Sequence, residues 1–221
     1  MRTKTMTTVG ILGGTGPAGR GVAIRLASAG YDVVLGSRDG ARATDTAATL
    51  LPRGTGSVSG ATNEVAAGCD LIVVATPWDS AVTTAKELKV QLANKIVISM
   101  VNALAREGKE LLPMYPSRGS MAAQLAFALP ESTVVGAFHH LPASLMEDLD
   151  SGLDADVVVF SDNAKASDEV AAIVSSMPGL RGVTTGSMSL ASAVEAFTAV
   201  CISINIRHKV HSYVKLAGFQ H

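Results

Sequence analysis

Residues 9–19 read VGILGGTGPAG, a short apolar run that changes abruptly into glycines. Residues 14–19 fit the pattern G-x-G-x-x-G, in which glycines allow a tight turn, a close backbone approach to a pyrophosphate and close packing of a helix on a strand. Pro17 suits the first turn of the following helix, where a missing backbone N–H costs nothing. The position of the motif between an expected strand and an expected helix predicts a dinucleotide-binding loop rather than a plain turn.

Short β-branched runs alternate with alanine-rich stretches along most of the chain. The runs predict buried strands of one parallel sheet, at residues 8–12, 32–36, 71–76, 96–100, 133–137 and 157–161. The stretches between them predict helices near residues 17–29, 41–51, 79–91, 119–128 and 166–176. This alternation is typical of a doubly wound, mostly parallel α/β fold of the Rossmann type.

The pattern changes after about residue 138. Residues 187–214 read SMSLASAVEAFTAVCISINIRHKVHSYV, a long helical run that is apolar on many sides and must be covered by other protein. We therefore expect a dinucleotide-binding Rossmann domain over residues 1–138. We expect residues 139–221 to form a smaller helical or α/β region that closes the cofactor cleft and forms the contact of a homodimer.

Composition excludes several classes of partner. The net charge is −1 and only 17% of residues are charged, so no basic field favours nucleic acid or anionic lipid. No uninterrupted apolar run approaches membrane-spanning length, and we expect a cytoplasmic protein without membrane or nucleic-acid partners. Cys69 and Cys201 lie in apolar surroundings without metal-binding spacing, so we expect buried free thiols and no metal site.

The end of the second expected strand indicates which dinucleotide is bound. An NAD site usually places an acidic residue there for the ribose 2′-hydroxyl. This chain instead has Gly36, which leaves room for a phosphate, followed by Ser37 and Arg38, with Arg42 one helical turn further on. A hydroxyl and a planar guanidinium are suited to a 2′-phosphate. Asp39 lies beyond the position that reads the hydroxyl, and the segment predicts NADP(H) rather than NAD.

Three loops at strand ends, residues 75–78, 99–102 and 138–143, should line one cleft beside the nicotinamide. The chain offers no Ser/His/Asp arrangement, no nearby carboxylate pair and no Tyr-x-x-x-Lys pair there. His139 and His140 are equally compatible with titration in the site and with a packing role. Carbonyl reduction needs a proton donor, whereas hydride transfer between two flat heterocycles mainly needs alignment, so the second reaction is favoured.

Four segments together resemble the NADPH-dependent F420 reductases: GILGGTGPAG, VVLGSRDGAR, VATPWDSAV and GAFHHLPA, in that family's order. The resemblance spans about residues 8 to 218. It implies a Rossmann domain and a small C-terminal domain with NADP and the deazaflavin F420 in the cleft between them. It also implies direct hydride transfer from one cofactor to the other with no catalytic side chain.

The resemblance assigns roles to individual residues. The pyrophosphate side would be held by Thr15, Gly16, Pro17 and Ala18. The 2′-phosphate would be held by Ser37, Arg38 and Arg42. Positions near the nicotinamide half would be Thr76, Ser80, Asn102 and Ala143. F420 would be bordered by His139 and Pro142.

Two other readings stay open. An NADP-dependent imine or keto-acid reductase on the same scaffold would use the C-terminal helices of a dimer to build its site, and it would need a proton donor. A non-catalytic NADP(H)-sensing protein would bind the nucleotide without turnover.

Overall fold

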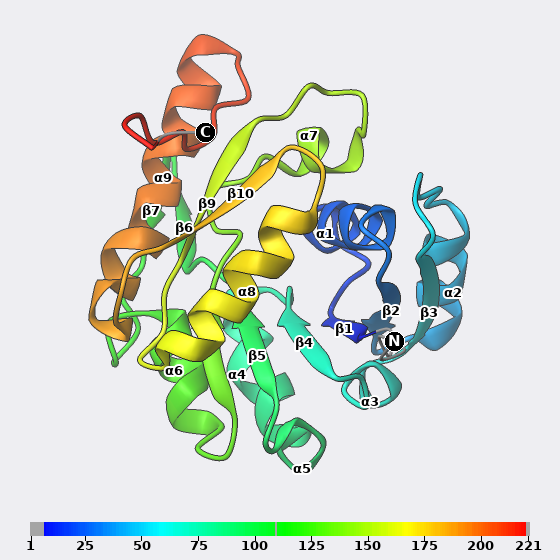
Figure 1. Ribbon diagram of the computed structural model, residues 1–221. Coiled ribbons are helices and arrows are strands. Elements are labelled where there is room, and N and C mark those ends of the chain that lie inside the picture. The colour runs from blue at the N-terminus through cyan, green and yellow to red at the C-terminus, as the bar shows by residue number, and fades with distance from the viewer. Residues whose placement is uncertain (1–6, 109, 220–221) are drawn as a thin grey trace.

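The computed structural model describes residues 7–108 and 110–219. Six parallel strands form the central sheet in the order β3-β2-β1-β4-β5-β8 (Figure 1). Their bounds are β1 Thr8–Leu12, β2 Asp32–Ser37, β3 Ser57–Thr62, β4 Leu71–Val74, β5 Ile96–Ser99 and β8 Thr133–Gly136. Because the order reverses direction beside β1, the sheet is doubly wound, and the expected Rossmann-type α/β fold is confirmed.

Helices lie between successive strands along the chain. The longer ones are α1 Pro17–Ser28, α2 Gly40–Ala48, α4 Trp78–Glu87, α6 Met121–Ala128 and α8 Ala164–Ser176. The shorter ones are α3 Asn63–Ala66, α5 Lys89–Leu92 and α7 Ala143–Glu147. The helix expected over residues 79–91 is broken at Leu88, which separates α4 from α5, and Pro77 is the residue at the N-cap of α4.

The sixth expected strand does not belong to the central sheet. It forms as β9 (Ala155–Val159), which pairs in parallel with β10 (Leu180–Thr184) in a separate two-stranded sheet. An antiparallel bridge between Phe160 and Gly136 links the end of this strand to β8 of the central sheet. A Cβ on Gly136 would lie 2.0 Å from the Phe160 ring, so the glycine is what lets this ring lie across the end of β8.

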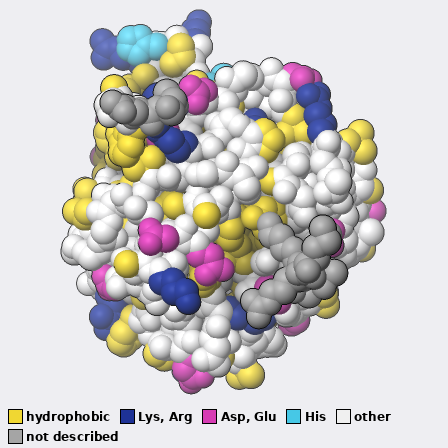
Figure 2. All heavy atoms as spheres, in the orientation of Figure 1, with side chains coloured by type: hydrophobic (Ala, Val, Ile, Leu, Met, Phe, Trp, Pro, Cys, Tyr) yellow, Lys and Arg dark blue, Asp and Glu magenta, His cyan; other side chains and the backbone are white. Residues whose placement is uncertain are grey.

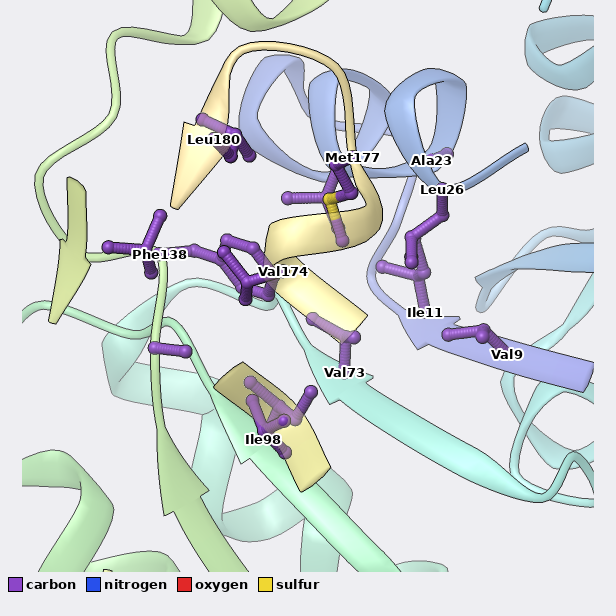
Figure 3. Close-up of a cluster of buried hydrophobic side chains, with 14 of the residues drawn as sticks. Val9, Ile11, Ala23, Leu26, Val73, Ile98, Phe138, Val174, Met177 and Leu180 are labelled. Atoms are coloured by element: carbon purple, nitrogen blue, oxygen red, sulfur yellow. The ribbon is translucent and has the colours of Figure 1, made fainter. Parts of the chain in front are cut away.

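One hydrophobic cluster joins the C-terminal elements to the sheet. It brings Val9 and Ile11 of β1 together with Leu26 of α1 and Val174 of α8, and Met177 follows at the end of α8 (Figure 3). The face of α8 that is buried therefore packs on α1 and the sheet rather than on a core of its own. A second cluster on the opposite face of the sheet includes residues of α4 and α6.

Arg25 fixes the segment around α7 to α1. Its guanidinium is almost fully buried and donates to the carbonyl oxygens of Met146 at 2.9 Å, Leu145 at 2.6 Å and Asp148 at 3.0 Å. It also donates to the carbonyl oxygen of Pro178 at 2.6 Å, at the turn before β10. Since α7 begins at Ala143, this network sets the position of one wall of the site described below.

The C-terminal helix α9 spans Ala191–His208 and follows a single 3₁₀ turn at Met188–Leu190. It is shorter than the expected run over residues 187–214, because Lys209 adopts a left-handed conformation with φ 54° and the chain then turns back. Asn205 stabilises this turn by accepting the backbone N–H of Ser212 at 2.6 Å. A further hairpin, β6 (Leu104–Glu107) and β7 (Glu110–Pro113), packs against α9.

Among the described residues, the stretch Met188–His208 has the length and mean hydropathy, 1.6, that would allow a helix to cross a bilayer. Only 28% of the most apolar 18-residue part of this stretch is buried within the structure. Much of its apolar surface is therefore left uncovered by the rest of the chain.

Candidate functional site

A cavity of about 870 Å³ lies at the carboxyl ends of the central strands, and α9 contributes part of its wall. This is the edge at which open α/β sheets bind ligands. The structure brings all the site residues expected from the sequence to this one cavity. They are Thr15, Gly16, Pro17, Ala18, Ser37, Arg38, Arg42, Thr76, Ser80, Asn102, His139, Pro142 and Ala143.

Three glycines of the first loop each contribute a different feature to its structure. Gly14 donates to the Ile11 carbonyl at 3.2 Å, which closes the turn, and to the Gly36 carbonyl of β2 at 2.9 Å. A Cβ on Gly19 would lie 2.6 Å from the Gly14 oxygen, so α1 packs directly on the loop. A Cβ on Gly16 would meet nothing within 4 Å, so the backbone there is open to a ligand. With Pro17 beginning α1, the free N–H groups of this helix end are available to an anion.

Asn63 is a site residue that the sequence did not reveal. Its side chain lines the cavity and accepts the backbone N–H of Gly13 at 3.1 Å, where Gly13 has φ 68°. It therefore holds the first loop in the shape that exposes Gly16. The strand before it, β3, was not expected, so its place at a strand end could not be recognised.

One arginine, Arg38, directly follows β2, and the other, Arg42, lies in the first turn of α2. Ser37, Arg38 and Arg42 line the cavity, and both guanidinium groups belong to exposed residues at its rim. Asp39 does not line it: its carboxylate caps α2 by accepting the backbone N–H of Arg42 at 3.2 Å. Packing also requires Gly36, because a Cβ there would lie 2.7 Å from Asn63 Oδ1.

The loop after β4 and one face of α4 form another wall. Thr76 is buried, and its Oγ1 has no hydrogen-bond partner within the described part of the chain. Trp78 lines the cavity and is 37% exposed, so contact of its ring with a bound ligand is favoured over core packing. Ser80 continues this wall, with Thr84 one helical turn along α4.

The segment that follows β8 lines the cavity, and its backbone is strained at Phe138. Phe138 has φ 68°, a conformation that costs a non-glycine residue energy and is found most often at functional sites. The next residue, His139, is buried, and its ring stacks on Phe160 at a centroid distance of 5.6 Å. Burial, and secondarily the neighbouring His140, lower the pKa of His139 to about 3. This imidazole is therefore neutral at physiological pH.

His140 ties the same segment to α9. Its Nε2 lies 2.6 Å from the carbonyl oxygen of Val194, and its ring meets the Phe197 ring edge-on at 5.5 Å. Burial also lowers the pKa of His140, with the Val194 contact acting in the opposite direction. A packing role is therefore favoured for His140 over titration in the site.

One stripe of α9 completes the cavity. The residues on it are Thr198, Cys201, Ile202 and Asn205, spaced as neighbours on one helical face. Burial raises the pKa of the Cys201 thiol, so this group is neutral. Both cysteines, Cys69 and Cys201, are buried and free, as expected.

The cavity thus combines an anion-binding loop and a basic pair with a wall of small, apolar and neutral side chains. Such a site can bind and align two planar ligands. Neither histidine is suited to proton transfer at neutral pH, because both favour the uncharged form.

Comparison with known proteins gives one consistent result. Residues 8–103 match the family model described as NADP oxidoreductase, coenzyme F420-dependent. The chain is 32% identical to the F420-dependent NADP reductase of Methanocaldococcus jannaschii, over 91% of this chain and 93% of that protein. It is 30% identical to the F420-dependent NADP reductase of Methanothermobacter thermautotrophicus, over 92% of this chain and 91% of that protein.

A solved structure from Arthrobacter sp. FB24, provisionally assigned as an F420-dependent NADP reductase, superposes with a TM-score of 0.80 at 27% identity. The match covers 96% of this chain and all of the other. The chain belongs to the family of coenzyme F420-dependent NADP oxidoreductases.

Proposed function

We propose that the protein transfers a hydride directly between NADP(H) and the deazaflavin coenzyme F420. The observation that carries this function is the single cavity, which is lined both by the glycine loop with its basic pair and by the neutral segment after β8. The named relatives support the same pair of cofactors. The cofactors supply the redox chemistry, and the protein supplies binding, alignment and exclusion of water.

On the NADP side, Thr15, Gly16, Pro17 and Ala18 bind the pyrophosphate at the start of α1. Ser37, Arg38 and Arg42 bind the 2′-phosphate. The carboxylate of Asp39 is used in capping α2, which removes the acidic group that would otherwise favour NAD.

Near the reacting rings, Thr76, Ser80, Asn102 and Ala143 border the nicotinamide half. His139 and Pro142 border F420. We assign residues 139–221 as the region that closes the cleft, because α7 and α9 both contribute to the cavity wall. Hydride transfer then requires no side-chain acid or base.

The function is tested by mixing the purified protein with NADPH and oxidised F420 and following the visible absorbance of the deazaflavin. Bleaching that depends on both cofactors is the expected result. Tight NADPH binding without exchange would contradict the proposed reaction and favour a sensing role. Reduction of an imine or keto acid in the absence of F420 would favour the alternative reductase.

We also propose that the protein is a cytoplasmic homodimer formed through α9. Phe197, Val200 and Ile204 lie on one face of this helix and are 44%, 46% and 40% exposed. Apolar side chains accordingly lie along the edge of the molecule formed by α9 (Figure 2). A second copy is a better cover than lipid, since Glu195, near the start of the helix, makes polar contacts to α6.

A further inference from the structure

Two hydrogen bonds join the side chain of Asn102 to His139. Asn102 Nδ2 donates to the His139 carbonyl oxygen at 3.2 Å, and Asn102 Oδ1 lies 2.9 Å from His139 Nδ1. A backbone carbonyl can only accept, so the amide must turn its NH₂ group toward that carbonyl and its oxygen toward the ring. An amide oxygen also can only accept. Nδ1 must therefore carry the ring proton, which leaves the lone pair on Nε2.

Other contacts keep the ring from moving away from this arrangement. Thr198 Oγ1 donates to the same His139 carbonyl at 3.0 Å, so both lone pairs of that oxygen are used. The ring face is nearly parallel to Phe160, with an interplanar angle of 15°. Phe160 is itself fully buried over Gly136. The orientation of the imidazole is thus fixed by three sets of contacts: the hydrogen bonds to the His139 carbonyl, the stacking on Phe160, and the hydrogen bond from Nδ1 to Asn102.

The remaining edge is unpaired. His139 is only 5% exposed, and its Nε2 has no hydrogen-bond partner within residues 7–108 and 110–219. A buried polar atom without a partner is costly, and such atoms concentrate where a ligand supplies the missing contact. His139 is also one of the residues that line the cavity.

We propose that Asn102 is a positioning residue that locks His139 as the neutral Nδ1–H tautomer, which leaves Nε2 of this cavity-lining residue as a buried, unpaired hydrogen-bond acceptor. The acceptor selects a ligand edge that carries an N–H or O–H group and disfavours one that carries only carbonyl oxygens. The identity of that ligand rests on the proposed function, whereas the tautomer does not.

The neighbouring titratable groups are compatible with a neutral ring. His140 precedes α7 on the same loop, and it disfavours a charge on His139. On α9, both oxygens of Glu195 accept N–H groups of α6, and burial keeps the Cys201 thiol protonated. No carboxylate of the described residues lies within hydrogen-bond distance of the ring, so Asn102→Asp would introduce the one anion that can stabilise an imidazolium there.

The direct test is nitrogen NMR of the protein labelled in histidine, since protonated and unprotonated ring nitrogens have well separated shifts. The wild type should show a protonated Nδ1 and an unprotonated Nε2 for His139, unchanged across the neutral pH range. Asn102→Ala should shift the tautomer ratio about tenfold toward Nε2–H, the effect of losing one ordinary hydrogen bond. Asn102→Asp should instead make the ring titrate at higher pH.

Asn163→Asp is the matched control. Asn163 caps α8 through Ala166 and does not line the cavity, and aspartate caps a helix equally well. This variant should reproduce the wild-type pattern. A wild-type His139 with Nε2–H, or an Asn102→Asp variant whose His139 signals match the wild type, would overturn the proposal even if every variant folds.

A kinetic measurement separates this proposal from the proposed function. With F420 as co-substrate, Asn102→Asp should show a KM for F420 that rises about tenfold as the pH falls, because the protonated ring no longer accepts a hydrogen bond. The wild type should lack this pH dependence. Absence of exchange in the wild type would contradict the proposed reaction, while the NMR result would still decide the tautomer.

Discussion

The carboxylate of Glu195 on α9 accepts the backbone N–H of Met121 at 2.7 Å, while its second oxygen accepts that of Ala122 at 2.9 Å. These N–H groups belong to the first turn of α6 and have no partner within that helix. Glu195 thus caps a helix that lies more than seventy residues earlier in the chain. The contact joins α9 to the rest of the fold at the level of the cavity.

Glu195 should make stability depend on pH. Burial is the larger influence and raises the pKa of this carboxyl to about 7, although the two N–H groups act to lower it. The folded protein therefore holds this proton more tightly than the unfolded chain. Its contribution to stability is full below about pH 4.5, the ordinary value for glutamate, and is lost as the pH rises to about 7.

The measurement is the free energy of unfolding in urea for the wild type and Glu195→Gln across this pH range. The wild-type value minus the variant value should fall by about 3 kcal/mol as the pH rises, on the scale set by the pKa difference. The comparison with the variant is needed because His139 and His140 have lowered pKa values, which make the free energy of unfolding rise with pH in both proteins. A difference that stays flat would contradict a protonated Glu195.

Arg38→Ala should weaken NADPH binding by roughly 1.5–3 kcal/mol, the range for hydrogen bonds to charged groups. Binding of NADH, which lacks the 2′-phosphate, should barely change. Calorimetric titration of both cofactors makes the comparison. Arg53→Ala is the matched control, since Arg53 pairs with Asp150 on the surface and does not line the cavity. Equal losses for both cofactors would show that Arg38 does not read the phosphate.

Replacement of Arg25 should destabilise the fold strongly. Arg25→Ala leaves several buried carbonyl oxygens around α7 without a donor, and we expect a loss of at least about 3 kcal/mol in the free energy of unfolding. Arg25→Lys should lose less, because one ammonium group can reach only part of this set. Equal stability of the wild type and Arg25→Ala in urea unfolding would contradict the role of the network.

The dimer proposal predicts that Ile204→Glu converts the protein to a monomer in sedimentation velocity, because a charge would be buried in the apolar contact. Val90→Glu makes the same chemical change on α5, where Val90 is also exposed, and should leave the assembly unchanged. A wild type that sediments as a monomer at micromolar concentration would exclude this interface.

The sequence was most informative where the hydrophobic pattern and the spacing of glycines indicate the same strands and turns. Five of the central strands were recognisable because they are buried runs of Val, Ile and Leu. The edge strand β3 was not, because its sequence SVSGAT is polar, small and half exposed. The strand β9 was recognised but given to the wrong sheet, since its apolar run does not encode which partner it pairs with.

The residues of the site likewise divide into those that local sequence patterns predict and those that they do not. Residues next to strand ends, such as Arg38 and Thr76, could be placed from the order of the strands alone. Asn63 could not, because its strand was missed. The contributions of Thr198 and Cys201 depend on how α9 lies against the sheet, which is a property of tertiary packing and not of local pattern.

The helix cap formed by Asp39 also bears on redesign of the cofactor preference. Exchanging the arginines for neutral residues would remove the proposed 2′-phosphate contacts without supplying a carboxylate for a ribose hydroxyl, since Asp39 is engaged with the backbone of α2. A variant meant to use NADH needs a new carboxylate at the tip of β2, at Ser37 or Arg38, with Asp39 kept in place. Without the cap, α2 would lose roughly 1 kcal/mol of stability along with its fixed start.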